Sequence, residues 1–490
     1  MHLIIRNHKF QYETENLLRV FFPEKLSVSE DIPEEGDYCF TELDGSLVTV
    51  KIRIGEKELS QSREYSFDDK VNDETDEAFL ERKLALQMFE LLTQATGYKP
   101  PWGILTGVRP AKLMSNLIRR YGELWTLPYF INELQVSEEK TKLALSVAYK
   151  EEDITETSRP DSCSLYISVP FCPTRCSYCS FISHSNESAK KLIPQYVEKL
   201  CEELRITARI AAELSLRLES IYIGGGTPTV LTATQLKAVT DTVSECFDLS
   251  SVKEYTVEAG RPDCTDEEKL KVLRECGCTR ISINPQTFND NVLEAIGRNH
   301  TSQMTVDCYN KARELGFDNI NMDLIAGLPS DTVESFEESL RKAIAMNPEN
   351  ITVHTLALKR SSNIVTESRR TNSAFAVTEM LERTQPLLLK AGYYPYYMYR
   401  QSKCLGNLEN VGWAKQGKDC LYNVYMMEEC HTVLAVGAGA VIKLKAPEGP
   451  EIERIFNYKY PYEYISGFDE IVRRKEYISE FYRKFTASDC

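Results

Sequence analysis

The chain has 490 residues, of which 42% are hydrophobic and 27% are charged, and its formal net charge is −15. That length allows two or three domains with large buried cores. The acidic balance argues against a surface that binds nucleic acid or an anionic membrane, and no apolar run approaches the length of about 18 residues that a membrane-spanning helix needs.

The start of the chain does not have the pattern of a secretory signal. Residues 1–20 include His, Arg, Lys and Glu, where a signal peptide would be apolar. The 15 cysteines are scattered apart from one tight cluster, which is typical of a reducing compartment. We therefore expect a cytoplasmic protein with no membrane span and no nucleic-acid partner.

Residues 1–70 predict a small α+β module. A short apolar run at residues 3–5 predicts a strand, and residues 13–22 predict a helix. The alternating runs 38–42 and 47–54 are joined by Asp44-Gly45, which is a strong signal for a β-hairpin. Nothing in this module carries chemistry.

Residues 71–160 predict a helical linker region. A charged stretch at 69–76 precedes apolar residues at helical spacing over 78–98, and further helices are expected near 112–121 and 137–149. The loop at 100–112 is dense in glycine, proline and positive charge. It is interpreted either as a contact to a carboxylated ligand or the next domain, or as a loop packed between helices.

From residue 161 to 360 the pattern changes to strand alternating with helix. Apolar runs predict strands near 165, 221, 254–257, 281, 319–325 and 351–358, with amphipathic stretches between them. Six such units in series require right-handed crossovers and a parallel sheet. The active site of such a sheet lies at the carboxyl ends of its strands.

Residues 361–490 predict a C-terminal region that covers the substrate. The tyrosine-rich stretch 392–400, with Arg400 and Lys403 nearby, suits a flat anionic macrocycle, and a core strand explains it equally well. The tail after Tyr458 is interpreted as a surface helix.

The most informative stretch is residues 166–181, in which Cys172, Cys176 and Cys179 have the spacing C-x3-C-x2-C. Thiolates select zinc or iron-sulfur clusters. A structural zinc site takes four ligands in closed coordination, whereas three thiolates leave one iron of a cubane cluster open for reaction. A zinc site and unligated core cysteines are the alternatives.

Other motifs follow the later strands and are expected on the same face. Glycines 224–226 end the second strand, where a ligand can approach the backbone closely. Glu258 ends the third strand, Gln286 the fourth, and Asp323 lies in the fifth; Arg298 follows Gln286 by twelve residues. Each of these signals is ordinary alone, but together they are specific.

The cysteine spacing is the signature of radical S-adenosylmethionine (SAM) enzymes, and the segment resembles that family. The further motifs G-G-G-T-P, V-E, P-Q-T-F-N, G-R-N-H, D-L-I-A-G-L-P and V-G-A-G-A resemble the oxygen-independent coproporphyrinogen III dehydrogenases, most closely the HemZ-type branch. The resemblance implies an α/β fold with a partial (β/α)6 radical SAM barrel, an N-terminal α+β region and a C-terminal extension.

The resemblance also implies the site. Cys172, Cys176 and Cys179 would hold a [4Fe-4S] cluster. One or two SAM molecules would be lined by Tyr166, Tyr178, Gly225, Gly226, Thr227, Glu258, Gln286, Arg298, Asp323 and Ala357. No side chain is singled out as catalytic. The chain departs from the family at Ser168, where the pattern Y-x-H-x-P-F-C has a histidine.

The activity that the resemblance implies is oxidative decarboxylation of coproporphyrinogen III to protoporphyrinogen IX. Its partners would be the tetrapyrrole substrate and a one-electron donor such as flavodoxin or ferredoxin. The alternatives are another radical SAM reaction on a tetrapyrrole, such as anaerobic haem breakdown, and a haem-binding chaperone.

Overall fold

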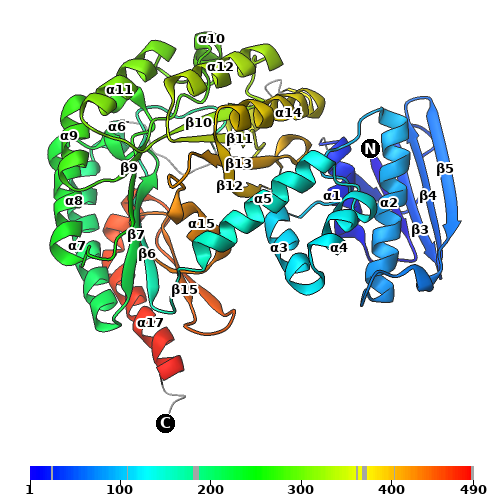
Figure 1. Cartoon of the computed structure of the whole chain (residues 1–490), viewed down its shortest axis with the longest axis horizontal. Helices are drawn as coiled ribbons and strands as arrows, with labels where there is room; N and C mark the ends of the chain where they lie inside the picture. The colour runs from blue at the N-terminus through cyan, green and yellow to red at the C-terminus, as the bar shows by residue number, and fades with distance from the viewer. Residues whose placement is uncertain are drawn as a thin grey trace. The chain divides into compact units, whose positions relative to one another are not determined.

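The computed structural model describes residues 1–23, 26–107, 109–179, 187–359, 362–366, 372–401 and 403–486. Phe181 of the cysteine motif, Val108 of the 100–112 loop and Ser361 lie outside the described residues. The chain forms two compact units (Figure 1). Each unit is a group of residues that pack together in space. The four sequence segments 1–70, 71–160, 161–360 and 361–490 are a different division of the chain, and they remain a prediction.

The first unit consists of Met1–Ala148, Ser373–Leu381 and Met398–Asn410. Its strands are β1 (His2–Arg6), β2 (Ser27–Ser29), β3 (Tyr38–Asp44), β4 (Leu47–Ile54) and β5 (Lys57–Glu64), in the sheet order β2-β1-β3-β4-β5. Its helices are α1 (Gln11–Phe21), α2 (Asp76–Thr96), α3 (Pro110–Tyr121), α4 (Glu123–Pro128) and most of α5 (Glu138–Thr155), with short turns η1 (Phe67–Asp69) and η2 (Tyr129–Glu133).

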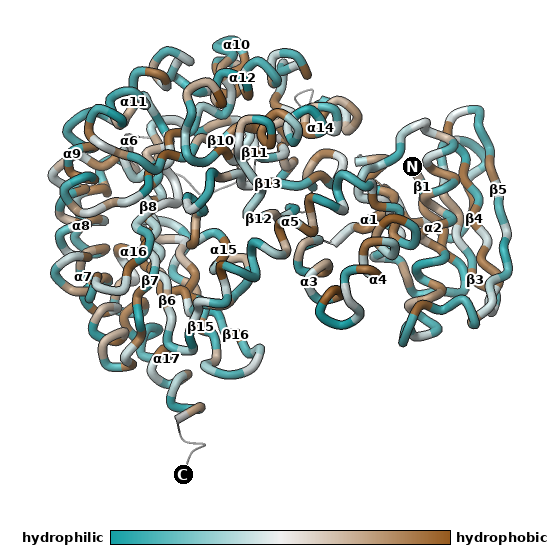
Figure 2. Tube along the Cα trace, in the orientation of Figure 1, coloured by the Kyte–Doolittle hydropathy of each residue, from teal (hydrophilic) through white to brown (hydrophobic). Residues whose placement is uncertain are grey.

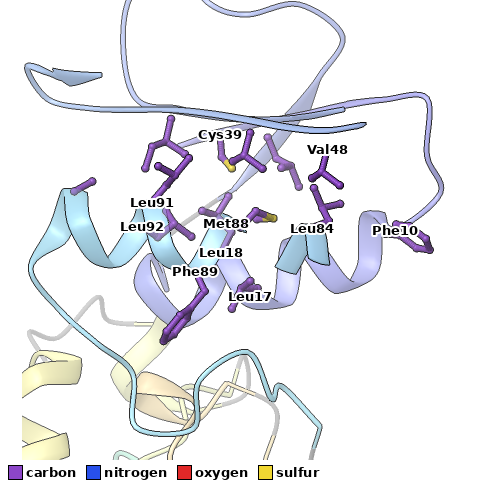
Figure 3. Close-up of a cluster of buried hydrophobic side chains, with 14 of the residues drawn as sticks. Phe10, Leu17, Leu18, Cys39, Val48, Leu84, Met88, Phe89, Leu91 and Leu92 are labelled. Carbon is purple, nitrogen blue, oxygen red and sulfur yellow. The ribbon is translucent and has the colours of Figure 1, made fainter. Parts of the chain in front are cut away.

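The core of this unit lies between the sheet and the two helices α1 and α2. Figure 3 shows Leu17 and Leu18 of α1 and Met88 of α2 lying below Cys39 and Val48 of the sheet, and all five side chains belong to one buried cluster. Because every second strand residue faces this cluster, the alternating sequence pattern correctly indicates the buried face.

The predicted hairpin is confirmed. β3 and β4 pair antiparallel around Gly45, whose φ of +61° is a conformation that glycine adopts without strain. Strand β5 was not expected, since its sequence is polar and Figure 2 shows it as largely hydrophilic. It is an edge strand that pairs with β4, and its Leu59 packs partly against the core.

The second unit consists of Tyr149–Asn372, Glu382–Tyr397 and Val411–Cys490. Its parallel strands are β6 (Ser162–Val169), β7 (Arg217–Gly225), β8 (Glu254–Glu258), β9 (Arg280–Ser282), β10 (Ile320–Ala326) and β11 (Asn350–Thr355). The helices among and after these strands are α6 (Glu187–Lys190), α7 (Ile193–Glu213), α8 (Ala233–Cys246), α9 (Glu267–Glu275), α10 (Asp290–Ala295), α11 (Ser302–Glu314), α12 (Val333–Met346) and α13 (Asn363–Thr366), with turns η3 (Pro228–Val230) and η4 (Pro262–Cys264).

The C-terminal part contributes strands and helices to both units, because Ser373–Leu381 and Met398–Asn410 belong to the first. The strands are β12 (Tyr394–Arg400), β13 (Glu409–Ala414), β14 (Thr432–Val436), β15 (Val441–Lys445) and β16 (Ile452–Phe456). The helices are α14 (Ala374–Lys390), α15 (Leu421–Glu428), α16 (Pro461–Ser466) and α17 (Phe468–Thr486), with a short turn η5 (Leu405–Asn407).

Strands β6 to β16 belong to one sheet, in the order β12-β13-β11-β10-β9-β8-β7-β6-β14-β15-β16. Strands β6 to β11 are neighbours in chain order and parallel, as the repeated strand-helix pattern predicts. Figure 1 shows helices α7 to α12 along the outside of these strands. The predicted α/β class with six parallel βα units is therefore confirmed.

Strand β14 was not expected beside β6. It pairs parallel with β6 along its whole length, with Leu434 opposite Leu165. This pairing brings the V-G-A-G-A segment at 436–440 to the carboxyl end of β6.

Among the described residues, no helix is both long and apolar enough to span a membrane.

The tyrosine-rich stretch forms the core strand β12. Tyr396, Met398 and Arg400 are all buried. Arg400 donates a 2.9 Å hydrogen bond to the carbonyl oxygen of Leu105, and a second hydrogen bond to that of Gly107. The guanidinium group thus holds the 100–107 loop within the first unit, which supports the alternative that this stretch is a core strand.

Candidate active site

The candidate residues lie where the parallel strands end. The cysteine loop follows β6, the glycines end β7, Glu258 ends β8, and Asp323 lies in β10. Because these strands are parallel neighbours, their carboxyl ends share one edge of the sheet. The structure therefore brings motifs as far apart as Cys172 and Asp323 to one face, as the sequence predicts.

The cysteine loop is fastened to the turn after α10. The backbone N–H of Ser177 donates to the carbonyl oxygen of Ile296 at 2.9 Å, and the Thr174 hydroxyl donates to that of Gly297 at 3.2 Å. None of Cys172, Cys176 and Cys179 forms a disulfide bond. Within the described part of the chain, no three His, Cys, Asp or Glu side chains are grouped closely enough to hold a metal ion.

The glycines after β7 allow close backbone packing. A Cβ atom on Gly226 would lie 2.5 Å from the carbonyl oxygen of Phe171, and one on Gly225 would lie 3.0 Å from the Ser168 hydroxyl. Gly225 also has a φ of +108°, which side chains disfavour. Thr227 donates its backbone N–H to Phe171 at 2.8 Å and its hydroxyl to the Cys172 sulfur at 3.5 Å. The glycine turn therefore supports the cysteine loop directly.

Ser168 lies at the end of β6 and is buried. Its hydroxyl donates a 2.8 Å hydrogen bond to the carbonyl oxygen of Ala438, and its own carbonyl oxygen accepts one of the same length from the Tyr196 hydroxyl. The Ser168 hydroxyl therefore bonds to the backbone of the V-G-A-G-A segment.

Three tyrosine rings line the inner face of the sheet beside Glu258. The ring of Tyr222 stacks on those of Tyr166 and Tyr422, with centroid distances of 6.2 and 4.6 Å. The Tyr222 hydroxyl donates a 2.6 Å hydrogen bond to Glu258 Oε1. Burial raises the pKa of Glu258 to about 7, although this hydrogen bond opposes the shift. Glu258 can therefore hold or release a proton near neutral pH.

Asp323 lies on the same inner face and is ionised. Burial opposes its ionisation, but His354 at 3.7 Å and the 2.7 Å hydrogen bond from Asn321 outweigh it and hold the pKa of Asp323 below its usual value. Asn321 also donates to the Ser282 hydroxyl at 2.7 Å. A connected polar lining therefore extends from β9 to β11.

Two buried side chains beyond β9 have polar atoms without a partner. Gln286 has a φ of +66°, and its Oε1 atom is buried and unpaired. Arg298 donates to the carbonyl oxygen of Asn284 at 2.8 Å and to the Tyr178 hydroxyl at 3.2 Å, but its Nε atom has no partner. Unpaired buried polar atoms are costly, so both side chains fit a site that takes a polar ligand. Ala357 lies half-buried just after β11.

Sequence reasoning missed four residues of this face. Arg261 lies beside Cys176, and the buried Arg280 opens β9. A charged residue at a strand end is a weak signal that could have indicated Arg261 and Arg280. Tyr222 and Tyr422 gave no signal, because an aromatic residue in an apolar stretch is usually part of the core.

The cysteine loop, the glycine turn and the parallel strands that carry them define a class of protein. Residues 166–343 match the model of the radical SAM superfamily. Proteins of this superfamily use a [4Fe-4S] cluster and SAM, so both are the cofactors of this chain.

Two similar proteins show to which family within this superfamily the chain belongs. The oxygen-independent coproporphyrinogen-III oxidase-like protein HemZ of Bacillus subtilis is 35% identical over 419 residues, which are 84% of each chain. The heme chaperone HemW of Haemophilus influenzae is 32% identical over 308 residues, covering 62% of this chain and 76% of that protein. The chain therefore belongs to the coproporphyrinogen-III oxidase-like family of radical SAM proteins.

A solved structure supports the fold. The structure of coproporphyrinogen III oxidase (HemN) from Escherichia coli superposes with a TM-score of 0.52 and 24% sequence identity, covering 66% of this chain and 73% of that one.

Proposed function

We propose that the protein is a radical SAM enzyme that decarboxylates two propionate side chains of coproporphyrinogen III and yields protoporphyrinogen IX. The observation that carries the proposal is one face of the sheet, on which the cysteine loop, Glu258 and Asp323 come from parallel strands. Gln286 and Arg298 lie in the segment between β9 and β10. The similarity to HemZ over 84% of both chains supports the same reaction class.

The residues present fit the two cofactors. Cys172, Cys176 and Cys179 supply three thiolates, which suit a cluster with one open iron. The unpaired Oε1 of Gln286 and Nε of Arg298 suit a polar ligand such as SAM. The proposed SAM-lining residues are those named from the sequence: Tyr166, Tyr178, Gly225, Gly226, Thr227, Glu258, Gln286, Arg298, Asp323 and Ala357.

When bound, the cluster and SAM supply carbon-radical chemistry, for which a one-electron donor such as flavodoxin or ferredoxin is needed. Each propionate would lose CO2, one hydrogen atom that ends in 5′-deoxyadenosine, and one electron that passes to a one-electron acceptor, as it becomes a vinyl group. The protein's own task is to orient the propionate and exclude water. The carboxylates of Glu258 and Asp323 give the face its polarity, and the stacked tyrosines Tyr166, Tyr222 and Tyr422 give it flat apolar walls.

The test is an anaerobic incubation with SAM, a reductant and coproporphyrinogen III, followed by analysis of porphyrins and nucleosides. Protoporphyrinogen IX together with 5′-deoxyadenosine is expected from the wild type, and neither from Cys176→Ala. Deoxyadenosine without protoporphyrinogen would contradict the proposed substrate.

A haem-binding chaperone is the second candidate, and the 32% identity to HemW favours it. Haem added in the same anaerobic reaction separates the candidates. Unchanged haem bound to the protein supports the chaperone, and an opened or alkylated tetrapyrrole supports haem breakdown.

A further inference from the structure

A buried arginine contacts one cysteine of the loop. Arg261 follows β8 and is 3% exposed, and its Nη1 atom lies 3.8 Å from the sulfur of Cys176. Cys176 is itself only 8% exposed, whereas Cys172 and Cys179 are half-buried. The cysteine that is most shielded from water is therefore the one that faces a guanidinium group.

The position of Arg261 is fixed from two sides. Its Nε and Nη2 atoms donate to the two carboxylate oxygens of Asp263 at 2.9 and 2.7 Å. Nη2 also donates to the hydroxyl of Thr174 at 3.0 Å, and Nη1 to the Thr174 carbonyl oxygen at 3.4 Å. Because a guanidinium group is planar and rigid, the pairing with Asp263 aims Nη1 at Cys176.

The second arginine near this loop is oriented differently. Arg298 directs Nη1 to the carbonyl oxygen of Asn284 and Nη2 to the hydroxyl of Tyr178. Cys176 is also one of the hydrogen-bonding and charge partners of Arg298, so both guanidinium groups act on this cysteine. The N–H···S contact with a defined donor atom is that of Arg261, whose Nη1 lies 3.8 Å from the Cys176 sulfur.

We propose that Arg261 tunes the reduction potential of the cluster by donating an N–H···S hydrogen bond to the Cys176 thiolate. Reduction adds one negative charge to a cluster that its thiolates already make negative. A buried N–H donor with a positive charge stabilises that reduced form more than the oxidised one. Arg261 thereby raises the potential and eases reduction by the electron donor. This inference depends on the cluster and is independent of the tetrapyrrole substrate.

The experiment compares Arg261→Met, Arg261→Lys and wild type, all as full-length protein reconstituted with iron and sulfide without oxygen. Iron per chain is measured first, and then the potential is titrated by electron paramagnetic resonance in the absence of SAM and substrate. Arg209→Met is the matched control, because Arg209 is an exposed arginine on α7.

The expected result is a more negative potential for Arg261→Met at wild-type iron content, and an intermediate value for Arg261→Lys, which keeps the charge but loses the rigid fork. Arg209→Met should have the wild-type potential. An unchanged potential in Arg261→Met would overturn the proposal.

A purely structural role gives a different result. In that case both Arg261 variants lose iron, and the clusters that remain keep the wild-type potential, which also overturns the proposal. If Arg261→Met does not fold, Arg261→Lys decides the question, because its potential must still lie below that of the wild type.

Discussion

The hydroxyl of Ser168, at the end of β6, donates a 2.8 Å hydrogen bond to the carbonyl oxygen of Ala438, which lies 270 residues later in the chain. The bond exists because β14 pairs with β6 and carries the V-G-A-G-A segment to the start of the cysteine loop. Ser168 stands where the family pattern has a histidine. Its hydrogen bond to Ala438 gives the side chain a structural role at this position.

We predict that Ser168 has a structural role. Ser168→Ala should still form protoporphyrinogen and should lower the free energy of unfolding by about 1 kcal/mol, the usual value of one hydrogen bond. Porphyrin analysis and denaturant titration measure the two effects. Ser244→Ala is the control, since the exposed Ser244 bonds only to its own helix, and it should change neither. Loss of turnover in Ser168→Ala with intact SAM cleavage would show that the hydroxyl acts in the reaction.

A side chain on Gly226 should displace the cysteine loop. Gly226→Ala places a Cβ atom 2.5 Å from the Phe171 carbonyl oxygen, and such overpacking costs about 1–3 kcal/mol. We expect lower iron content after anaerobic reconstitution and a lower melting temperature. Gly107→Ala is the matched control, because a Cβ there meets no atom within 4 Å. Normal iron content in Gly226→Ala would mean that the loop can move aside.

The cluster itself should depend on the cysteine loop alone. Wild type should bind about four irons per chain and show an air-sensitive brown chromophore. Cys176→Ala should lose both, whereas Cys404→Ala, which replaces a buried cysteine outside the loop, should keep them. Tightly bound zinc that iron cannot replace would contradict the cluster assignment.

Glu258 should make stability depend on pH. Its pKa is about 7 in the folded protein and 4.5 ordinarily, so the folded state holds a proton that the unfolded state has lost between these values. The free energy of unfolding should therefore fall as pH rises from about 4.5 to about 7, by at most about 1.4 kcal/mol per pH unit.

The Glu258→Gln variant isolates this effect, because it has no proton to lose. Without SAM, its stability relative to wild type should be greater at pH 8 than at pH 5. The exposed Glu213, changed to Gln, serves as the control and should show no such trend. Parallel pH profiles of wild type and Glu258→Gln would contradict the raised pKa.

A buried ion pair should anchor the C-terminal helix. Lys475 of α17 is 1% exposed and lies 3.0 Å from Glu203 of α7, whose other oxygen accepts hydrogen bonds from Gly437 N and the Tyr464 hydroxyl. Lys475→Met leaves a buried charge unpaired and should cost about 3–5 kcal/mol. Denaturant titration tests this, with the exposed Arg473→Met as control. The double variant Glu203→Gln/Lys475→Met should lose less free energy of unfolding than the two single variants Glu203→Gln and Lys475→Met lose together. If the two losses simply add, the pair is not coupled.

The sequence by itself determined the order of elements and the location of the site along the chain. The Asp44-Gly45 turn, the six strands from β6 to β11 and the motifs at their ends are local patterns, in which turn chemistry and hydrophobic periodicity act over a few residues. Since parallel strands place their carboxyl ends on one edge, the meeting of these motifs also follows from the sequence.

Only the tertiary structure decided the long-range contacts that no local pattern indicates. The pairing of β14 with β6, the contact of Arg261 with Cys176 and the stacking of Tyr422 on Tyr222 join segments that share no local signal. The tail after Tyr458 is helical as expected, in α16 and α17, but which of its side chains are buried, such as Tyr464 and Lys475, was set by packing. Periodicity indicates which face of an element is buried, but the partner of that face is set by long-range packing.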